Sequence, residues 1–320
     1  MKRILVVGAG GQIGSELVPY AQSIYGAQNV IAADLDESKC KDLAENGPFE
    51  KLNALDSERF LGIVKKYNVD TIYNLVALLS ATGEKNPTLA WQINMKALEN
   101  SLEIARQENC AVFTPSSIGA FGPTTPPNKT PQDTIMQPTT IYGVCKVAGE
   151  LLSNYYFTRF GVDTRSVRFP GIISNVTLPG GGTTDYAVEI YYEAIKKHSY
   201  TCNLSKGTFL DMMYMPDALK ACIELMEADP NKLKHRNSFN VTAMSFDPEI
   251  IASAIKMHIP DFKMDYDIDP IKQKIADSWP NSLDDTCARD EWNWKPDYNL
   301  ESMTIDMLKK VGEKFKKGLY

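Results

Sequence analysis

Residues 2–14 read KRILVVGAGGQIG, in which an apolar run is followed by closely spaced glycines. The run ILVV predicts a buried parallel strand, and Gly8, Gly11 and Gly14 predict a tight turn that leads into a helix. Glycines in such a turn let backbone N–H groups and a helix N-terminus approach a pyrophosphate. A glycine triplet alone is a weak signal, but its place directly after a strand indicates a dinucleotide site.

The next predicted strand, residues 29–33, ends at Asp34. An acid at this point can accept hydrogen bonds from both ribose hydroxyls of adenosine and repels a 2′-phosphate, which favours NAD over NADP. Alternatively, Asp34 is an exposed acid at a strand end. After a second helix, residues 52–56 (LNALD) are expected under the adenine, and Asp56 is equally suited to be the N-cap of a helix over residues 57–67.

A strand predicted over residues 110–113 delivers Ser116 and Ser117 into a loop, and Tyr142 and Lys146 follow in a predicted helix. Residues four apart share a helix face, with their Cβ atoms about 6 Å apart. An isolated tyrosine has a pKa of about 10, and about 4 kcal/mol of selective stabilisation is needed to bring a phenol near 7. A lysine cation and an oxidised nicotinamide are plausible sources. Such pairs also occur on solvated helices, but the serine loop and the nucleotide-binding start favour alcohol oxidation.

A third core strand is predicted over residues 71–76, and Ala77 follows it where the chain of a Rossmann-type sheet approaches the cofactor. Ser80 then either faces the substrate or caps a turn. Residues 88–107 show apolar side chains at helical spacing, with Asn94 among them. A buried amide needs partners, so Asn94 is either a structural clasp or part of a proton relay behind the lysine.

The composition excludes several classes of protein. At 320 residues and 43% hydrophobic, the chain can form one large α/β domain or a main domain with a smaller partner. It has no apolar run near the length of a membrane span and no cleavable leader, so we expect a soluble, cytoplasmic protein with no membrane partner. A net charge of −6 without a basic cluster argues against nucleic acid. The six cysteines are scattered with no C-x-x-C, and the three histidines are not clustered with them, so we expect free thiols and no metal site.

Together these motifs resemble the extended short-chain dehydrogenase/reductase superfamily. Within this superfamily, the amino-acid sequence is similar to that of one family, the short-chain-type L-threonine 3-dehydrogenases. The phrases that carry this resemblance include PSSIGAFGP (115–123), TPQDTIMQPTTIYGVCK (130–146), PGGGTTDYAVEIYYEAI (179–195) and KIADSWPNSLDD (274–285).

The resemblance implies an α/β fold, namely a Rossmann-type doubly wound parallel sheet with a smaller C-terminal substrate-binding lobe. Residues 1–172 are expected to form the NAD-binding domain, to which 205–245 return. Residues 173–204 and 246–320 are expected to form the lobe.

The resemblance also implies roles for individual residues. Ser117 matches the catalytic hydroxyl, Tyr142 the general base, and Lys146 the residue that holds the nicotinamide ribose. The residues expected to bind NAD are Gly8, Gly11, Gln12, Ile13, Gly14, Asp34, Leu35, Asn53, Ala54, Leu75, Ala77, Asn94, Tyr142, Lys146 and Ile172. Those expected to contact the substrate are Ser80, Ser116, Ser117, Tyr142, Thr183, Thr184 and Trp279.

Several of these assignments leave alternatives. The segment PGGGTTDYA is expected to close over the pocket with its glycines as hinges, or to be an ordinary connection. Thr184 rather than Thr183 is expected to contact the amino acid, and Trp279 either walls the pocket or belongs to the core. Two residues depart from the pattern: Asn53 replaces a more usual acid near the adenine, and Asp211 stands where a less acidic residue is expected.

The implied reaction is NAD-dependent oxidation of the β-hydroxyl of L-threonine to L-2-amino-3-oxobutyrate, in threonine catabolism. The resemblance further implies a homodimer formed through the helices after Thr88 and after Tyr142, and transfer of the product to a 2-amino-3-oxobutyrate CoA ligase. The nearest alternative is a nucleotide-sugar epimerase or dehydratase, which needs a basic pocket where this chain offers PGGGTTD and ADSWP. A redox-sensing protein that holds NAD without turnover would predict loss of Tyr142 or Lys146, and both are present.

Overall fold

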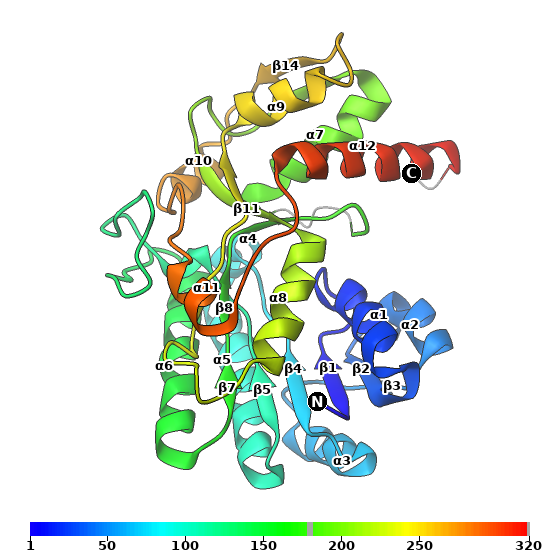
Figure 1. Ribbon diagram of the computed structural model, residues 1–320, viewed down its shortest axis with the longest axis vertical. Helices are drawn as coiled ribbons and strands as arrows, with labels where there is room; N and C mark the ends of the chain where they lie inside the picture. The colour runs from blue at the N-terminus through cyan, green and yellow to red at the C-terminus, as the bar shows by residue number, and fades with distance from the viewer. Residues whose placement is uncertain (178–181, 319–320) are drawn as a thin grey trace.

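The computed structural model describes residues 1–177 and 182–318, and the parallel sheet at its centre confirms the predicted fold class (Figure 1). Six strands pair in the order β3-β2-β1-β4-β5-β7, and each neighbouring pair is parallel. They are β1 (Ile4–Val7), β2 (Val30–Asp34), β3 (Phe49–Lys51), β4 (Thr71–Asn74), β5 (Ala111–Phe113) and β7 (Thr164–Arg165). The strand order reverses between β1 and β4, where a doubly wound sheet binds its ligand beyond the carboxyl ends of the strands.

Helices cover both faces of this sheet because successive strand residues point to opposite sides. Ile4 and Val6 join the core under α1 (Gly14–Tyr25) and α8 (Met215–Glu227). Leu5 and Val7 join the core on the other face. The helices that contribute to this second core are α3 (Ser57–Tyr67), α5 (Pro87–Glu108) and α6 (Ile141–Phe160).

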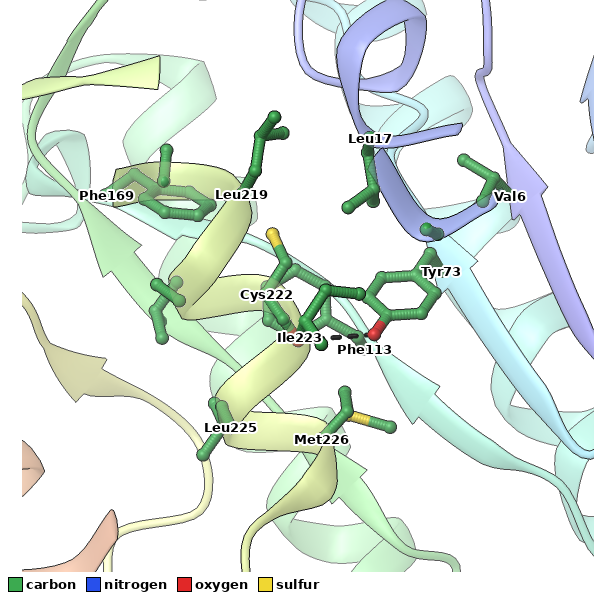
Figure 2. Close-up of a cluster of buried hydrophobic side chains, with 14 of the residues drawn as sticks. Val6, Leu17, Tyr73, Phe113, Phe169, Leu219, Cys222, Ile223, Leu225 and Met226 are labelled. Carbon is green, nitrogen blue, oxygen red and sulfur yellow. Dashed lines mark hydrogen bonds between the residues drawn. The ribbon is translucent and has the colours of Figure 1, made fainter. Parts of the chain in front are cut away.

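A long-range contact fastens α8 to the first of these cores. Figure 2 shows Leu219, Cys222 and Ile223 of α8 facing the same region as Leu17 of α1 and Tyr73 of β4. The Tyr73 hydroxyl donates to the carbonyl oxygen of Cys222 at 3.2 Å. A segment more than a hundred residues from the first half of the sheet thus completes the nucleotide-binding core.

The second half of the chain supplies smaller elements, most of which lie above the sheet in Figure 1. Two three-stranded sheets have the orders β13-β11-β9 and β12-β8-β6, and β10 pairs with β14. The strands are β6 (Ser116–Ser117), β8 (Val167–Phe169), β9 (Gly171–Ile173), β10 (Ser199–Cys202), β11 (Leu210–Tyr214), β12 (Phe239–Asn240), β13 (Met244–Phe246) and β14 (Lys263–Tyr266). The remaining helices are α2 (Lys41–Asn46), α4 (Ser80–Lys85), α7 (Tyr186–Lys197), α9 (Pro248–Lys256), α10 (Pro270–Ala276), α11 (Thr286–Trp292) and α12 (Leu300–Lys316).

The helix predicted over residues 57–67 is confirmed as α3, and Asp56 is its N-cap because its Oδ1 accepts the Arg59 N–H at 3.0 Å. In the C-terminal part, Trp292 and Trp294 pack in the core beneath α1 and α8. Within the described part of the chain, no helix is both long and apolar enough to cross a membrane.

The structure explains the acid at position 211. Asp211 lies on β11 and is fully buried. Its Oδ1 accepts the Thr242 hydroxyl at 2.6 Å and its Oδ2 accepts the Leu283 N–H at 2.7 Å. Desolvation by burial raises the pKa of Asp211 to about 8. The side chain therefore joins two distant segments to β11 and retains its proton under neutral conditions.

Replacing Asp211 by asparagine is expected to flatten the pH dependence of stability. Because the folded-state pKa exceeds the ordinary value, the contribution of this carboxyl is complete below about pH 4 and is lost as the pH rises towards 8. Asparagine reproduces the protonated group. At pH 8 we expect Asp211→Asn to be more stable than the unchanged chain by about 1–3 kcal/mol, and at pH 5 to be close to it. Urea unfolding at both pH values measures this, and an identical pH slope in the two proteins would contradict it.

Candidate active site

The glycine turn after β1 is closed too tightly for side chains. A Cβ added to Gly14 would lie 2.4 Å from the carbonyl oxygen of Gly8 and 2.7 Å from the Cα of Ala9. Gly8 itself has φ +85°, a conformation that glycine adopts without steric cost. The backbone thus presents a close-packed turn and the N-terminus of α1 at the switch point of the sheet, which fits the pyrophosphate of a dinucleotide.

Asp34 fastens the end of β2 to this turn. Its Oδ2 accepts the Gly10 N–H at 2.8 Å, and its Oδ1 accepts the Asp36 N–H at 2.9 Å. The carboxylate therefore stands beside the glycine turn, where it would hold the adenosine ribose of NAD.

The predicted adenine segment is also held in place. Asn53 uses its Oδ1 to accept the Leu55 N–H at 3.1 Å, so this oxygen closes a local turn. Asn100 of α5 donates to the carbonyl oxygen of Ala54 at 2.8 Å. The residues present around the turn and this segment fit an NAD molecule.

A cleft of about 170 Å³ lies at the carboxyl ends of β1, β4 and β5, between the sheet and the lobe. It brings together most of the residues predicted for the nicotinamide and substrate. Those that line it are Gln12, Ile13, Leu75, Ala77, Ser80, Ser116, Ser117, Tyr142, Lys146, Ile172, Thr183, Thr184 and Trp279. Gly8, Gly11, Gly14, Asp34, Leu35, Asn53, Ala54 and Asn94 do not line it.

Tyr142 and Lys146 lie in the first two turns of α6 and face the cleft. The Nζ of Lys146 is 5.3 Å from the centroid of the Tyr142 ring and donates to the carbonyl oxygen of Pro115 at 2.6 Å. The Tyr142 ring packs against Gly119, where an added Cβ would lie 3.1 Å from Cδ1 and Cε1 of the ring. The predicted pair is thus brought together, and the ammonium is anchored to the serine loop.

The two serines of the loop have different partners. Ser117 is the N-cap of a short 3-10 turn, residues 118–120, and its Oγ accepts the Gly119 N–H at 3.1 Å. A hydroxyl has one hydrogen and two acceptor positions, so Ser117 can still donate to a substrate oxygen. Ser116 is buried and donates to Oε1 of Glu150 at 2.5 Å. The geometry therefore favours Ser117 as the hydroxyl that meets the substrate.

Glu150, which was not predicted, forms a buried ion pair behind the serine loop. Arg168 donates through Nε to Oε1 at 3.0 Å and through Nη2 to Oε2 at 2.8 Å. Both side chains are about 4% exposed. The Nη1 of Arg168 also donates to the Gln132 carbonyl and to Oδ1 of Asn240. The sequence signal that could have identified Glu150 was an acidic residue one helical turn after Lys146 in an apolar helix.

Asn94 acts as a clasp. Its Oδ1 accepts the Leu78 N–H at 2.7 Å and its Nδ2 donates to the Leu78 carbonyl at 3.2 Å. Both ends of the amide are thus used by one backbone residue, which fixes the loop between β4 and α4. A small cavity of about 30 Å³ separates Asn94 from Lys146 and Glu150.

On the lobe side, Thr183 and Thr184 differ in the way their hydroxyls are used. Thr183 is 2% exposed, and its Oγ1 finds no hydrogen-bond partner among residues 1–177 and 182–318. Thr184 packs closely on Gly171, where an added Cβ would lie 2.8 Å from its Cγ2. An unsatisfied buried hydroxyl is costly, so the geometry favours Thr183 over Thr184 as the group that bonds a ligand.

The other two predicted substrate contacts also reach the cleft. Ser80 is buried at the start of α4 and lines it. Trp279 lines the cleft and also packs in the hydrophobic core of the lobe. The two alternatives, a wall of the pocket and a core residue, therefore both apply to it. The expected hinge glycines before Gly182 lie outside the described residues.

Comparisons with known proteins show the family of the chain and several structures that are similar to it. A family model described as the NAD dependent epimerase/dehydratase family matches residues 4–242. The structure of an L-threonine dehydrogenase from Clostridium difficile is 58% identical, with a TM-score of 0.97 and 98% of each chain covered. A GalE-like L-threonine dehydrogenase from Cupriavidus necator, in its holo form, is 49% identical with a TM-score of 0.92, covering 97% of this chain and 99% of that one. An uncharacterized epimerase/dehydratase of Staphylococcus aureus (strain MRSA252) is 57% identical over 314 residues, 98% of each chain.

Proposed function

Because the chain belongs to the NAD dependent epimerase/dehydratase family, we propose that it uses this cleft to oxidise L-threonine at its β-hydroxyl, with NAD as the acceptor. The observation that carries the proposal is the arrangement of Ser117, Tyr142 and Lys146 around a cleft whose opposite wall holds Thr183 and Trp279. The likeness to two L-threonine dehydrogenases over nearly the whole chain supports it.

The charges of the cleft match an amino acid better than a nucleotide sugar. Among the described residues that line it, the charged side chains are Lys146 and Asp185. A nucleotide diphosphate needs several cationic partners once water is excluded, and a single lysine, already anchored to Pro115, does not supply them. Asp185 provides a carboxylate for the substrate ammonium, and the hydroxyls of Ser80 and Thr183 suit its carboxylate.

In the proposed reaction each of the three catalytic side chains has its own step. Tyr142 accepts the proton of the substrate β-hydroxyl as the general base. Ser117 donates to the reacting oxygen and holds it during conversion of C–O–H to C=O. Lys146, fixed by the Pro115 carbonyl, keeps its positive charge 5.3 Å from the centroid of the Tyr142 ring. Bound NAD would supply the acceptor for the hydride of the β-carbon, and 2-amino-3-oxobutyrate would be the product.

A substrate comparison at fixed NAD tests this function. We expect NADH formation with L-threonine and none with UDP-glucose. Turnover of the nucleotide sugar without turnover of L-threonine would overturn the choice of substrate while leaving the catalytic residues in place.

The preference for NAD over NADP is expected to depend on Asp34. Replacing Asp34 by asparagine removes the negative charge that repels a 2′-phosphate, while the amide oxygen can still accept the Gly10 N–H. We expect the ratio of kcat/KM for NAD to that for NADP to fall at least about tenfold. Asp36→Asn is the matched control, because this neighbouring acid caps the next turn and should leave the ratio unchanged. An unaltered ratio in Asp34→Asn would contradict the assignment.

We also propose that the chain forms a homodimer through α5 and α6. These helices pack against each other and expose large apolar side chains, which stable folds usually cover. The exposed side chains are Leu89, Trp91, Val144, Leu151 and Tyr155. Light scattering is expected to give twice the chain mass, and Leu151→Asp to shift the protein towards monomer. If the unsubstituted protein is monomeric at micromolar concentration, the homodimer proposal is contradicted.

A further inference from the structure

Three side chains with metal-ligating atoms meet away from the cleft, where α11 packs beside the segment that precedes β12. They are His235, Cys287 and Glu291, and their ligand atoms all lie within 4.8 Å of one another. Cys287 and Glu291 stand four residues apart on α11, so they share one face of the helix. All three side chains are partly exposed, which leaves the group accessible from solvent.

The surroundings of this group already have the form of an outer ligand shell. The Nδ1 of His235 contacts Oε1 of Glu291, and its Nε2 lies 3.5 Å from Oδ2 of Asp133. The second oxygen of Glu291 accepts the N–H groups of Lys234 and His235 at 2.5 and 3.1 Å. In metal sites the ligating histidine commonly donates its other N–H to a carboxylate, and ligating carboxylates are themselves hydrogen-bonded. Here Glu291 is hydrogen-bonded in this way, and the exposed carboxylate of Asp133 lies near Nε2 without a hydrogen bond to it.

We propose that His235, Cys287 and Glu291 bind a divalent transition-metal ion of the Zn²⁺ class, through Nδ1, Sγ and Oε1. A thiol and an imidazole are poor ligands for Mg²⁺ and Ca²⁺, which take oxygen, whereas Zn²⁺ binds all three atom types. Three protein ligands leave a fourth position for water. The ion replaces the proton of the hydrogen bond between Nδ1 and Oε1, which passes to solvent, and the thiol likewise releases its proton to solvent as the Sγ–metal bond forms.

The site has a structural setting that a bound ion would reinforce. Gln132, next to Asp133, donates to the Ser238 carbonyl and accepts the Asn240 N–H. Its own carbonyl oxygen accepts from Arg168. An ion held by His235, Cys287 and Glu291 would tie α11 to the segment that precedes β12. Because the ion would bind only the folded state, it would raise the unfolding temperature.

This proposal differs from the sequence analysis, which predicted no metal site. His235 and Cys287 are far apart along the chain and form no recognisable ligand spacing. Only the packing of α11 near β12 brings them together.

A cobalt titration of tag-free protein, treated with a chelator and then dialysed, tests the proposal. Co²⁺ bound to a thiolate gives a sulfur-to-metal charge-transfer absorption, which reports Cys287 directly. We expect one equivalent of Co²⁺ to saturate this band and Zn²⁺ to displace it. The band should be absent in Cys287→Ser, and the affinity should fall at least about 10-fold in His235→Asn, which removes a ligand.

The controls separate metal binding from a merely structural His235–Glu291 hydrogen bond. Cys287→Ser leaves that hydrogen bond intact, so it should unfold at the same temperature as the unchanged chain without metal and lose only the stabilisation by Zn²⁺. His198→Asn is the matched histidine control, because His198 contacts Asp261 at 2.7 Å outside this group, and it should bind as the unchanged chain does. The proposal is overturned if the unsubstituted protein shows no thiolate band, if Cys287→Ser binds Zn²⁺ equally well, or if His198→Asn weakens binding as much as His235→Asn.

Discussion

Tyr142→Phe is expected to lower kcat for L-threonine by about 10²–10⁴-fold, because the substrate hydroxyl then loses the group that accepts its proton. The ring itself remains, so its packing against Gly119 and the neighbouring Lys146 is retained. NADH binding, followed by its fluorescence, should therefore change little. This combination of a lost rate with retained binding distinguishes a chemical role from a structural one.

Tyr155→Phe is the matched control for this experiment. Tyr155 lies on the same helix, but it is 53% exposed and does not line the cleft. Its replacement should leave kcat within about twofold. A Tyr142→Phe protein that turns over L-threonine at a near-normal rate would remove the tyrosine from the mechanism, whatever its substrate affinity.

Arg168→Met is expected to have the largest effect on stability. It leaves the carboxylate of Glu150 buried without its cation, and breaking a buried pair in this way costs about 3–5 kcal/mol. Urea unfolding measures the loss. Adding Glu150→Gln should recover about 1–3 kcal/mol, because the neutral amide no longer needs a cation and still accepts from Ser116.

A second arginine pair provides the comparison. Arg289 forms a bidentate contact with Asp285, but its side chain is 45% exposed. Arg289→Met is therefore expected to cost less than about 1 kcal/mol. If Arg168→Met cost no more than this, the buried pair would not be a main support of the serine loop.

The features predicted successfully from the sequence are those that arise within one segment. The strand and glycine turn at Gly8–Gly14 follow from local spacing, because sterics at Gly14 depend on residues only a few positions away. The shared face of Tyr142 and Lys146 follows from helical periodicity alone. The N-cap at Asp56 is likewise a local hydrogen bond.

The features that were missed depend on contacts between distant segments. Ser116 was predicted to contact the substrate or to stand behind the residues that do; it lines the cleft, and its hydroxyl donates to Glu150, whose carboxylate is held by Arg168 of β8. The family resemblance favoured Thr184 over Thr183. The structure packs Thr184 on Gly171 and leaves the buried Thr183 hydroxyl without a partner among the described residues. Asp211 had no local explanation because its partners, Thr242 and Leu283, come from other parts of the chain.

The way in which Lys146 is held affects how the protein tolerates mutation. Its ammonium bonds a main-chain carbonyl, that of residue 115, and every amino acid supplies such an oxygen. No exchange of a single side chain can delete this acceptor, whereas a carboxylate in its place would be lost in one substitution. Genetic variation at that position can therefore displace the cation only by bending the backbone.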